Sequence, residues 1–292
     1  MDPVSIIVNP AAGGGRALRR ARAAEALLAS KGRAVDLRCT DGPGHARALA
    51  RDVALSGGGR VLACGGDGTL HEVAGGLCGS ATDLAVLPCG RGNDFAGALG
   101  VSGRVEEAVA TVLGDRRVRL DLGSVNGEPF CTVAAIGFDA EVDRHVAAGG
   151  KRTAGRFAYL AGALTMLFPY KAAGFRFEGD FGVREGRYLL GAVANTSRYG
   201  AGVRIAPAAR ADDGLLDLCL VRDLPRLTAL RLLPSTFTGG HVHRPEVEIL
   251  RTATLRVSAD RPMPVVADGE LVAELPVTVG VLPKALAMLL PR

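Results

Sequence analysis

The sequence predicts a two-domain α/β protein, with an N-terminal domain built on a parallel sheet and a β-rich, β-sandwich-like C-terminal domain. Two observations predict it. Over the first third of the 292 residues, short apolar runs alternate with segments of helical periodicity. After about Arg117, extended segments joined by turn signals replace this alternation. We therefore expect one domain at residues 1–116, a second at 117–282, and a tail at 283–292 that packs back on the first.

The elements of the first domain follow from the apolar pattern. Short apolar runs predict strands at residues 5–8, 35–39, 61–64 and 84–87. Helical spacing predicts helices at residues 16–30 and 45–55, from about 69, near 95, and at 105–113. Because strands and helices alternate, we expect parallel strands with helices on both faces of the sheet.

The second domain is predicted from its turns. Asn126-Gly127 and Asp268-Gly269 are typical of two-residue hairpin loops, whose central residues need positive φ angles. The strands that these turns would join lie at residues 120–125 and 130–136, and at 264–267 and 271–275. After Pro283 the chain is rich in alanine and leucine, which predicts a short helix.

The composition limits the class of protein. Hydrophobic residues make up 48% of the chain, enough for real cores, and no apolar run approaches the ~20 residues that span a bilayer. The sequence shows no signal-peptide pattern, so we expect a cytoplasmic protein whose membrane contact, if any, is peripheral. Six scattered cysteines without a CxxC pair are expected to be reduced. With 4% aromatic residues and no tryptophan, no nucleic-acid partner is expected.

A glycine-rich loop follows the first predicted strand and opens the next helix. It consists of Asn9, Pro10, Ala11, Ala12 and Gly13 to Gly15, with Arg16 as the first helical residue. Bare backbone N–H groups at a helix N-terminus bind phosphate. The absence of GxxxxGK[ST] excludes a P-loop. The alternative to phosphate binding is that these glycines only make the turn from strand to helix.

Two further loops repeat this arrangement. Gly65-Gly66-Asp67-Gly68-Thr69 contains a carboxylate, which suits a magnesium ion bound together with phosphates. Residues 87–96 contain Arg91, Asn93 and Asp94. The alternative is that Asn93 or Asp94 serves only as the N-cap of the next helix. Loops at consecutive strand ends converge on one crevice in an open α/β sheet, which predicts a nucleotide-phosphate site.

These motifs resemble those of the bacterial soluble diacylglycerol kinases and lipid kinases, which are related to eukaryotic diacylglycerol, sphingosine and ceramide kinases. The resemblance spans nearly the whole chain. It is carried by residues 8–10 with Gly13, by Gly65 to Val73, by Leu87-Pro88, Gly90 and residues 93–96, and by Asp268-Gly269-Glu270. GGDGT alone also occurs in NAD kinases and resembles a phosphofructokinase motif, but its combination with NPxxG and DGE is specific to lipid kinases.

The resemblance implies a two-domain fold with ATP and Mg²⁺ bound at an active site in the cleft between the domains. It places the nucleotide contacts at Asn9, Pro10, Ala11, Ala12, Gly13, Arg16, Thr40, Gly65, Gly66, Asp67, Gly68, Thr69, Leu70, His71, Arg91, Asn93 and Asp94. Most relatives have a threonine at the position of Arg91, so the role of this arginine stays open, although a guanidinium also binds phosphate.

A cluster of acids precedes a predicted strand at residues 218–221. One interpretation is a plain turn before the strand. The resemblance instead implies a structural magnesium site, with the Asp213 side chain and the carbonyls of Arg210 and Leu215 as ligands. A few oxygens completed by water suit magnesium.

Asp268 and Glu270 are two further acidic residues, separated by one glycine. Either they are solvated acids of a hairpin, or, as the resemblance implies, they act in catalysis together with Asp67. Both qualify chemically as the acceptor of the proton that a lipid hydroxyl loses.

The segment 156–168 is apolar nearly all round, which predicts a buried helix. The alternative is an acyl-chain pocket or a membrane-facing surface, with Lys151, Arg152 and Arg156 meeting anionic head groups.

Together these features predict an ATP-dependent lipid kinase that converts diacylglycerol to phosphatidic acid. The alternatives are a kinase of a sphingoid base, a polyprenol or NAD, and a non-catalytic regulator that binds nucleotide or lipid. The expected partner is a lipid substrate at a membrane surface, and any oligomer is expected to be a homodimer.

Overall fold

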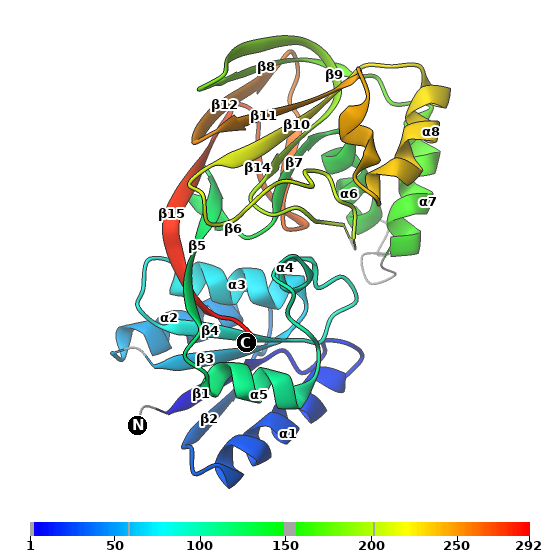
Figure 1. The fold of residues 1–292 in the computed structure, drawn as a ribbon. Coiled ribbons are helices and arrows are strands. Elements are labelled where there is room, and N and C mark those ends of the chain that lie inside the picture. Colours follow the sequence, from blue (N-terminus) through cyan, green and yellow to red (C-terminus); the bar gives the residue numbers. More distant parts are fainter. Residues whose placement is uncertain (1–2, 58, 149–155, 201) are drawn as a thin grey trace. The chain divides into compact units, whose positions relative to one another are not determined.

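The computed structural model describes residues 3–57, 59–148, 156–200 and 202–292, and the chain divides into two compact units (Figure 1). The first unit comprises Met1–Asp121 and Pro283–Arg292, and the second comprises Leu122–Leu282. The chain leaves the first unit within strand β5 (Arg117–Val125) and returns to it within β15 (Val277–Leu289). The first unit therefore contains both ends of the chain.

The first unit is built on parallel strands. The central strand β1 (Val4–Val8) lies between β2 (Val35–Cys39) and β3 (Arg60–Gly65), and β4 (Asp83–Pro88) pairs with β3. The helices are α1 (Arg16–Ser30), α2 (His45–Leu55), α3 (Asp67–Leu77), α4 (Asp94–Ala98) and α5 (Val105–Leu113). Helices α1 and α5 cover one face of the sheet, and α2 and α3 cover the other (Figure 1). The predicted alternation of strands and helices is confirmed.

Both faces of this sheet are buried. Val4, Ile6 and Val8 pack in one core with the helix pair α1 and α5, whereas Ile7 points to the other face and is also fully buried. Helix α1 contributes Ala17, Ala21, Ala24 and Leu28 to its core. A parallel strand covered by helices on both sides needs consecutive apolar residues, and this is the pattern that made β1 predictable.

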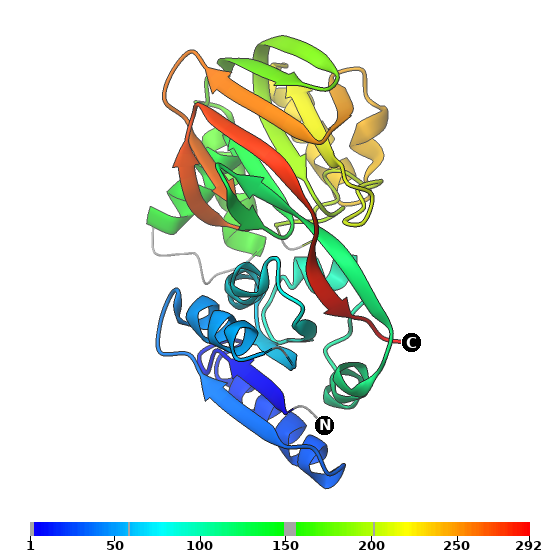
Figure 2. The ribbon, with the colours of Figure 1, turned by 90° about the vertical axis from the view of Figure 1, so that its left-hand side faces the viewer.

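The end of the chain differs from the prediction. Residues 283–289 form the last part of β15 and not a helix. Met288 of β15 lies opposite Leu84 of β4, and Figure 2 shows the end of β15 (dark red) next to β5 (green). Residues 285–289 are all buried. Periodicity cannot distinguish a strand buried on both faces from a buried helix, which explains the error.

The second unit is mainly antiparallel. Its remaining strands are β6 (Glu128–Phe130), β7 (Val133–Gly137), β8 (Ala173–Gly179), β9 (Gly182–Ala194), β10 (Leu216–Arg222), β11 (Val247–Thr252), β12 (Thr254–Ala259), β13 (Pro264–Ala267) and β14 (Glu270–Glu274). Strand β9 pairs with β8 over its first half, and with β7 and β10 over its second half. From there, β7 leads to β13 and β14, whereas β8 leads to β12 and β15. The prediction of a β-rich second domain is confirmed.

Both predicted hairpin turns are present. Asn126 and Gly127 have φ angles of 50° and 89°, and Asp268 and Gly269 have 50° and 79°. Positive φ at both central residues is the geometry that favours Asn-Gly and Asp-Gly. The strand predicted at residues 130–136 is interrupted, because β6 ends at Phe130 and β7 starts only at Val133.

The described part of the second unit also contains helices. They are α6 (Phe138–Ala148), α7 (Arg156–Leu167), α8 (Arg226–Thr236) and a 3₁₀ helix, η2 (Gly240–His243). Only α7 was expected from the sequence, since α6 follows β7 without a loop and α8 contains Pro234. Among the described residues, no helix is long and apolar enough to cross a lipid bilayer.

Candidate functional site

Three loops lie at the carboxyl ends of neighbouring parallel strands in the first unit. The first loop (residues 9–15) connects β1 to α1. The segment called the second loop (65–69) includes the last residue of β3 and the start of α3, and the third loop (89–94) runs from the end of β4 to the first residue of α4. The Asn9 N–H donates to the Cys64 carbonyl at 3.1 Å, and the Cys89 N–H donates to the Gly65 carbonyl at 2.7 Å. The strand pairing therefore continues into the loops and holds them side by side.

The first loop requires glycine for two reasons. Gly13, Gly14 and Gly15 have φ angles of 62°, 67° and 84°, which L-residues with side chains rarely adopt. In addition, a Cβ atom at Gly13 would lie 2.4 Å from the carbonyl oxygen of Cys89 in the third loop. The backbones of the first and third loops thus approach closely only because Gly13 has no side chain.

Side chains at both ends of the first loop stabilise its backbone. The Asn9 Oδ1 accepts a hydrogen bond from the Ala11 N–H at 3.0 Å, and the Ala12 N–H donates to the Asn9 carbonyl at 3.1 Å. The Arg16 Nε donates to the Gly13 carbonyl at 2.8 Å. The exposed Arg16 therefore folds back over the loop and places its positive charge beside it.

The second and third loops also touch through glycines. A Cβ atom at Gly90 of the third loop would lie 2.6 Å from the Cα of Gly66 in the second loop. Within the second loop, a Cβ atom at Gly65 would lie 2.4 Å from the Thr69 side chain. Such distances leave no room for any residue larger than glycine at these positions. The glycines predicted from the sequence to form a phosphate loop are therefore also required for the loops to pack together.

Asp67 connects the second loop to the third. Its Oδ2 accepts the Asn93 N–H and its Oδ1 accepts the Asp94 N–H, each at 2.7 Å. Asp67 therefore caps the N-terminus of α4 from another helix. A carboxylate oxygen has two lone pairs, so these two hydrogen bonds do not by themselves exclude a cation as a further partner of Asp67.

Asn93 occupies the N-cap position of α4, as one interpretation of the third loop expected, but its side chain makes no capping hydrogen bond. The Asn93 side chain instead closes the loop on itself, accepting from the Gly90 N–H at 2.9 Å and donating to the Gly90 carbonyl at 3.0 Å. Asp94 is the first residue of the helix. Asp94 is buried, whereas Arg91 is exposed.

Glu72 has a structural role that the sequence analysis did not assign. Its Oε1 accepts the Gly44 N–H at 2.8 Å and its Oε2 accepts the Ala46 N–H at 2.9 Å, so it caps the N-terminus of α2. The only signal in the sequence was its place inside the quoted motif, three residues after Thr69.

Two further groups of predicted nucleotide contacts lie in the first unit, one beside the end of β1 and one at the start of α3. Thr40 is buried, and its N–H donates to the Val8 carbonyl at 2.9 Å. Thr69, Leu70 and His71 are buried in the first turn of α3. The His71 Nε2 lies 3.5 Å from a guanidinium nitrogen of Arg47, another residue that the sequence did not single out.

In the second unit, Asp268 and Glu270 lie in different environments. The Asp268 Oδ2 accepts the Cys131 N–H at 2.6 Å, and its Oδ1 accepts both the N–H of Thr132, at 2.7 Å, and its hydroxyl. Asp268 therefore fixes the turn between β6 and β7, which explains the interruption of the predicted strand. The Glu270 side chain is exposed at the start of β14.

The predicted structural metal ligands also lie in the second unit. The Asp213 Oδ1 accepts the Leu215 N–H at 3.2 Å, and its Oδ2 contacts the guanidinium of Arg251. The Arg210 guanidinium pairs with both oxygens of Asp212, at 3.0 and 3.2 Å. The Arg251 guanidinium thus contacts the Asp213 oxygen that accepts no backbone hydrogen bond, so a cation bound to that oxygen would compete with a positive charge. No group of three acidic, histidine or cysteine side chains suited to a metal ion occurs among the described residues.

An apolar cavity of about 70 Å³ lies in the second unit. It is lined by Phe138 of α6, Ala163, Leu164 and Leu167 of α7, Leu189 and Leu190 of β9, Ile205, Val221 of β10, Ala229, Leu232, Leu233 and Thr236 of α8, and His241. Leu164 of α7 is 39% exposed and Phe168 is 58% exposed. Lys151 and Arg152 lie outside the described residues, as does the side chain of Arg156.

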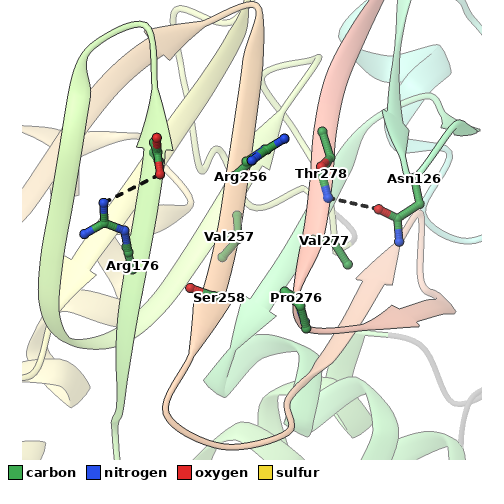
Figure 3. A pocket seen from close by; sticks show the side chains of 9 residues that line it. Asn126, Arg176, Arg256, Val257, Ser258, Pro276, Val277 and Thr278 are labelled. Atoms are coloured by element: carbon green, nitrogen blue, oxygen red, sulfur yellow. Dashed lines mark hydrogen bonds and ion pairs between the residues drawn. The ribbon is translucent and has the colours of Figure 1, made fainter.

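A groove of about 350 Å³ crosses strands β8, β12 and β15 of the second unit (Figure 3). Asn126 closes one side, its Oδ1 accepting the Thr278 N–H at 2.9 Å. Arg176 pairs with Glu185 at 2.9 Å and with Glu178 at 3.6 Å. The groove contains none of the residues predicted from the sequence to bind nucleotide, metal or lipid.

Comparison with known families gives two matches that together cover almost the whole chain. A family model described as the diacylglycerol kinase catalytic domain matches residues 3–125. A second, described as the YegS C-terminal NAD kinase beta sandwich-like domain, matches residues 132–290.

Similar proteins agree with these matches. A diacylglycerol kinase of Mycobacterium tuberculosis strain H37Rv is 34% identical over 99% of this chain and 95% of its own length. A Pseudomonas aeruginosa PAO1 protein described as "Probable lipid kinase YegS-like" is 35% identical over 92% of this chain and 89% of its own. A crystal structure of a diacylglycerol kinase from Bacillus anthracis strain Sterne superposes with a TM-score of 0.81 at 24% identity, covering 99% of this chain and 97% of that one. This last likeness concerns the fold.

Proposed function

Because this chain belongs to the family of diacylglycerol kinases and YegS-like lipid kinases, we propose that it transfers the γ-phosphate of ATP to the hydroxyl of diacylglycerol and so forms phosphatidic acid. The observation that carries this proposal is the set of three backbone-lined loops at the ends of β1, β3 and β4, joined by the carboxylate of Asp67.

The loops supply the groups that phosphates need. The glycines of the first loop expose backbone N–H groups, and the positive end of the α3 dipole lies at the second loop. Arg16 adds a full positive charge beside the first loop. Such preorganised donors stabilise the charge on a transferring phosphoryl group without reorganising during the reaction.

Asp67 and Asp94 are the residues that we propose to hold magnesium with the nucleotide. Magnesium bound there would offset negative charge on the phosphate oxygens. Asp67 would do so while its two hydrogen bonds fix its carboxylate, so removing it should disturb both the ion and the third loop.

Glu270 is the better proton acceptor of the two acids in the DGE motif. Asp268 accepts three hydrogen bonds from Cys131 and Thr132, two of them at Oδ1, so it is held more tightly than Asp67 and its main role is to shape the backbone. Glu270 is exposed and next to that rigid turn. We therefore assign the proton transfer to Glu270 and a positioning role to Asp268.

The apolar cavity supports a lipid as the acceptor. At about 70 Å³ it holds only part of an acyl chain, so the walls formed by α7 and α8 would have to separate to admit more. Leu164, which lines the cavity, and Phe168 are both exposed, and such apolar surface is in keeping with peripheral contact with a membrane.

The proposal is tested by incubating the protein with γ-labelled ATP, magnesium and mixed micelles that contain one acceptor at a time. Labelled phosphatidic acid from diacylglycerol is the expected product. Faster labelling of a sphingoid base, a polyprenol or NAD would replace the proposed acceptor. Absence of labelling with every acceptor would favour a non-catalytic regulator.

Two substitutions distinguish the roles of Asp268 and Glu270. Glu270→Gln should lower turnover by about 10²–10⁴-fold with an unchanged melting temperature. Asp268→Asn should lower the melting temperature, because an amide cannot accept all the hydrogen bonds made to the carboxylate. The opposite pattern would reverse the two roles.

A further inference from the structure

The turn before β10 carries Asp212 and Asp213, strand β10 itself carries Asp217, and two arginines contact these aspartates. Asp217 is 2% exposed and lies directly opposite Arg251 in the antiparallel pairing of β10 with β11. The Arg251 Nε is 3.8 Å from the Asp217 Oδ1. The same guanidinium donates to the Asp213 Oδ2. One arginine therefore bridges two carboxylates that are four residues apart in the chain.

The local backbone makes this bridge possible. Gly214 has a φ angle of 74°, which turns the chain sharply between Asp213 and the strand. The Leu215 N–H then donates to the Asp213 Oδ1 at 3.2 Å and fixes the side chain with its other oxygen toward β11. Because Arg251 is held in the β11 ladder, its guanidinium reaches Asp213 from the neighbouring strand.

A divalent cation would need the space that the guanidinium fills. Magnesium prefers about six oxygens in a near-octahedral arrangement and usually keeps several waters. Here one oxygen of Asp213 accepts a backbone N–H and the other contacts Arg251. The third aspartate, Asp212, is paired with Arg210. The Asp217 Oδ2 is buried without a hydrogen-bond partner, but the other oxygen of the same carboxylate lies 3.8 Å from the Arg251 Nε. A cation bound to Asp213 or Asp217 would therefore lie beside the Arg251 guanidinium and be repelled by its charge.

We infer that Arg251 supplies, in this chain, the positive charge for which the family resemblance implied a structural magnesium ion. The second unit then needs no metal for its stability. Any requirement of the protein for a divalent cation belongs to the nucleotide site of the first unit alone. This inference does not depend on the identity of the lipid acceptor.

The test uses the full-length protein without nucleotide. Its melting temperature is measured in excess EDTA and over a range of Mg²⁺ concentrations, and bound Mn²⁺ is counted by electron paramagnetic resonance. The wild type should melt at the same temperature with and without Mg²⁺. Arg251→Met should lower the melting temperature by about 5 °C, and Mg²⁺ should restore part of that loss, because Asp213 and Asp217 are then unpaired.

Arg256→Met is the matched control. Arg256 is exposed on β12, five residues further along the chain, and its loss should leave the melting temperature unchanged. The inference is overturned if Arg251→Met is as stable as Arg256→Met. It is also overturned if the wild type gains stability from Mg²⁺ or binds Mn²⁺ in a manner that Asp213→Asn abolishes.

Discussion

Replacing Asp139 by asparagine should change how the stability of the second unit depends on pH. Asp139 lies in the first turn of α6, is 3% exposed, and accepts a hydrogen bond from the Tyr199 hydroxyl. Burial, and then the charge of Asp143, raise the pKa of Asp139 from 3.8 to about 7. Folding therefore favours the protonated carboxyl.

The magnitude follows from the shift. At about 1.36 kcal/mol per pKa unit, the change from 3.8 to about 7 corresponds to about 4 kcal/mol. This stabilisation is fully present below pH 3.8, where the carboxyl of the unfolded chain is protonated too. It decreases as pH rises toward about 7, because only the folded state still holds the proton, and above that pH it is lost.

Tyrosine fluorescence reports the unfolding of the second unit, which contains Asp139. The chain has no tryptophan, and its four tyrosines are Tyr159, Tyr170, Tyr188 and Tyr199, all within the second unit. In urea unfolding, the wild type should lose about 3 kcal/mol between about pH 5 and pH 8. Asp139→Asn should lose much less, since its amide oxygen still accepts from Tyr199 but does not titrate.

Glu185→Gln serves as the control for this experiment. Glu185 forms an exposed ion pair with Arg176, and such pairs contribute little to stability. This variant should keep the pH dependence of the wild type. If Asp139→Asn and the wild type show the same pH dependence, Asp139 is not protonated in the folded protein and the reasoning is refuted.

Three further predictions concern the loops of the first unit. Gly13→Ala should destabilise the protein by about 2 kcal/mol more than Gly14→Ala in thermal unfolding, since both have positive φ but only the first meets the Cys89 carbonyl; equal losses would contradict the close approach. Asp67→Asn should lower stability by about 2 kcal/mol and abolish detectable turnover, because an amide accepts only one of the two backbone N–H groups; full stability by circular dichroism would show that the cap is dispensable. Glu72→Gln should raise the KM for ATP without abolishing kcat, because an amide accepts only one of the two N–H groups at the start of α2. An unchanged KM would show that this cap does not affect nucleotide binding.

The N-terminal elements were predictable because the constraint on them is local. A parallel strand with helices on both faces must be continuously apolar, as in β1, and each following helix must repeat apolar residues at helical spacing, as in α1. The two hairpin turns were equally local, since Asn-Gly and Asp-Gly suit positive φ angles at both positions.

The partners of the acidic residues could not be predicted, because they are distant in the chain. Asp67 binds backbone groups 26 and 27 residues away, and Asp268 binds groups 136 and 137 residues away. Residue type alone gave Asp268 and Glu270 the same chemistry. Only the hydrogen bonds of Asp268 distinguish a residue that shapes the backbone from one whose side chain faces solvent.

The sequence also could not show that Arg251 faces the turn before β10. An arginine in a strand is ordinarily a solvated residue, and its position opposite Asp217 depends on the register between β10 and β11. A one-residue shift in that register would turn Arg251 to the other face of the sheet. The prediction of a helix after Pro283 was wrong for a different reason. Burial on both faces removes the periodicity that distinguishes a strand from a helix.

The position of β15 has a consequence for how the chain folds during synthesis. A domain usually folds once its own stretch of chain has left the ribosome. Here residues 283–289 complete the strand next to β4 and are translated after all of the second unit. Until they emerge, the edge of β4 is unprotected and open to pairing with other chains. Strand β15 can therefore cover the edge of β4 only after the second unit has been translated.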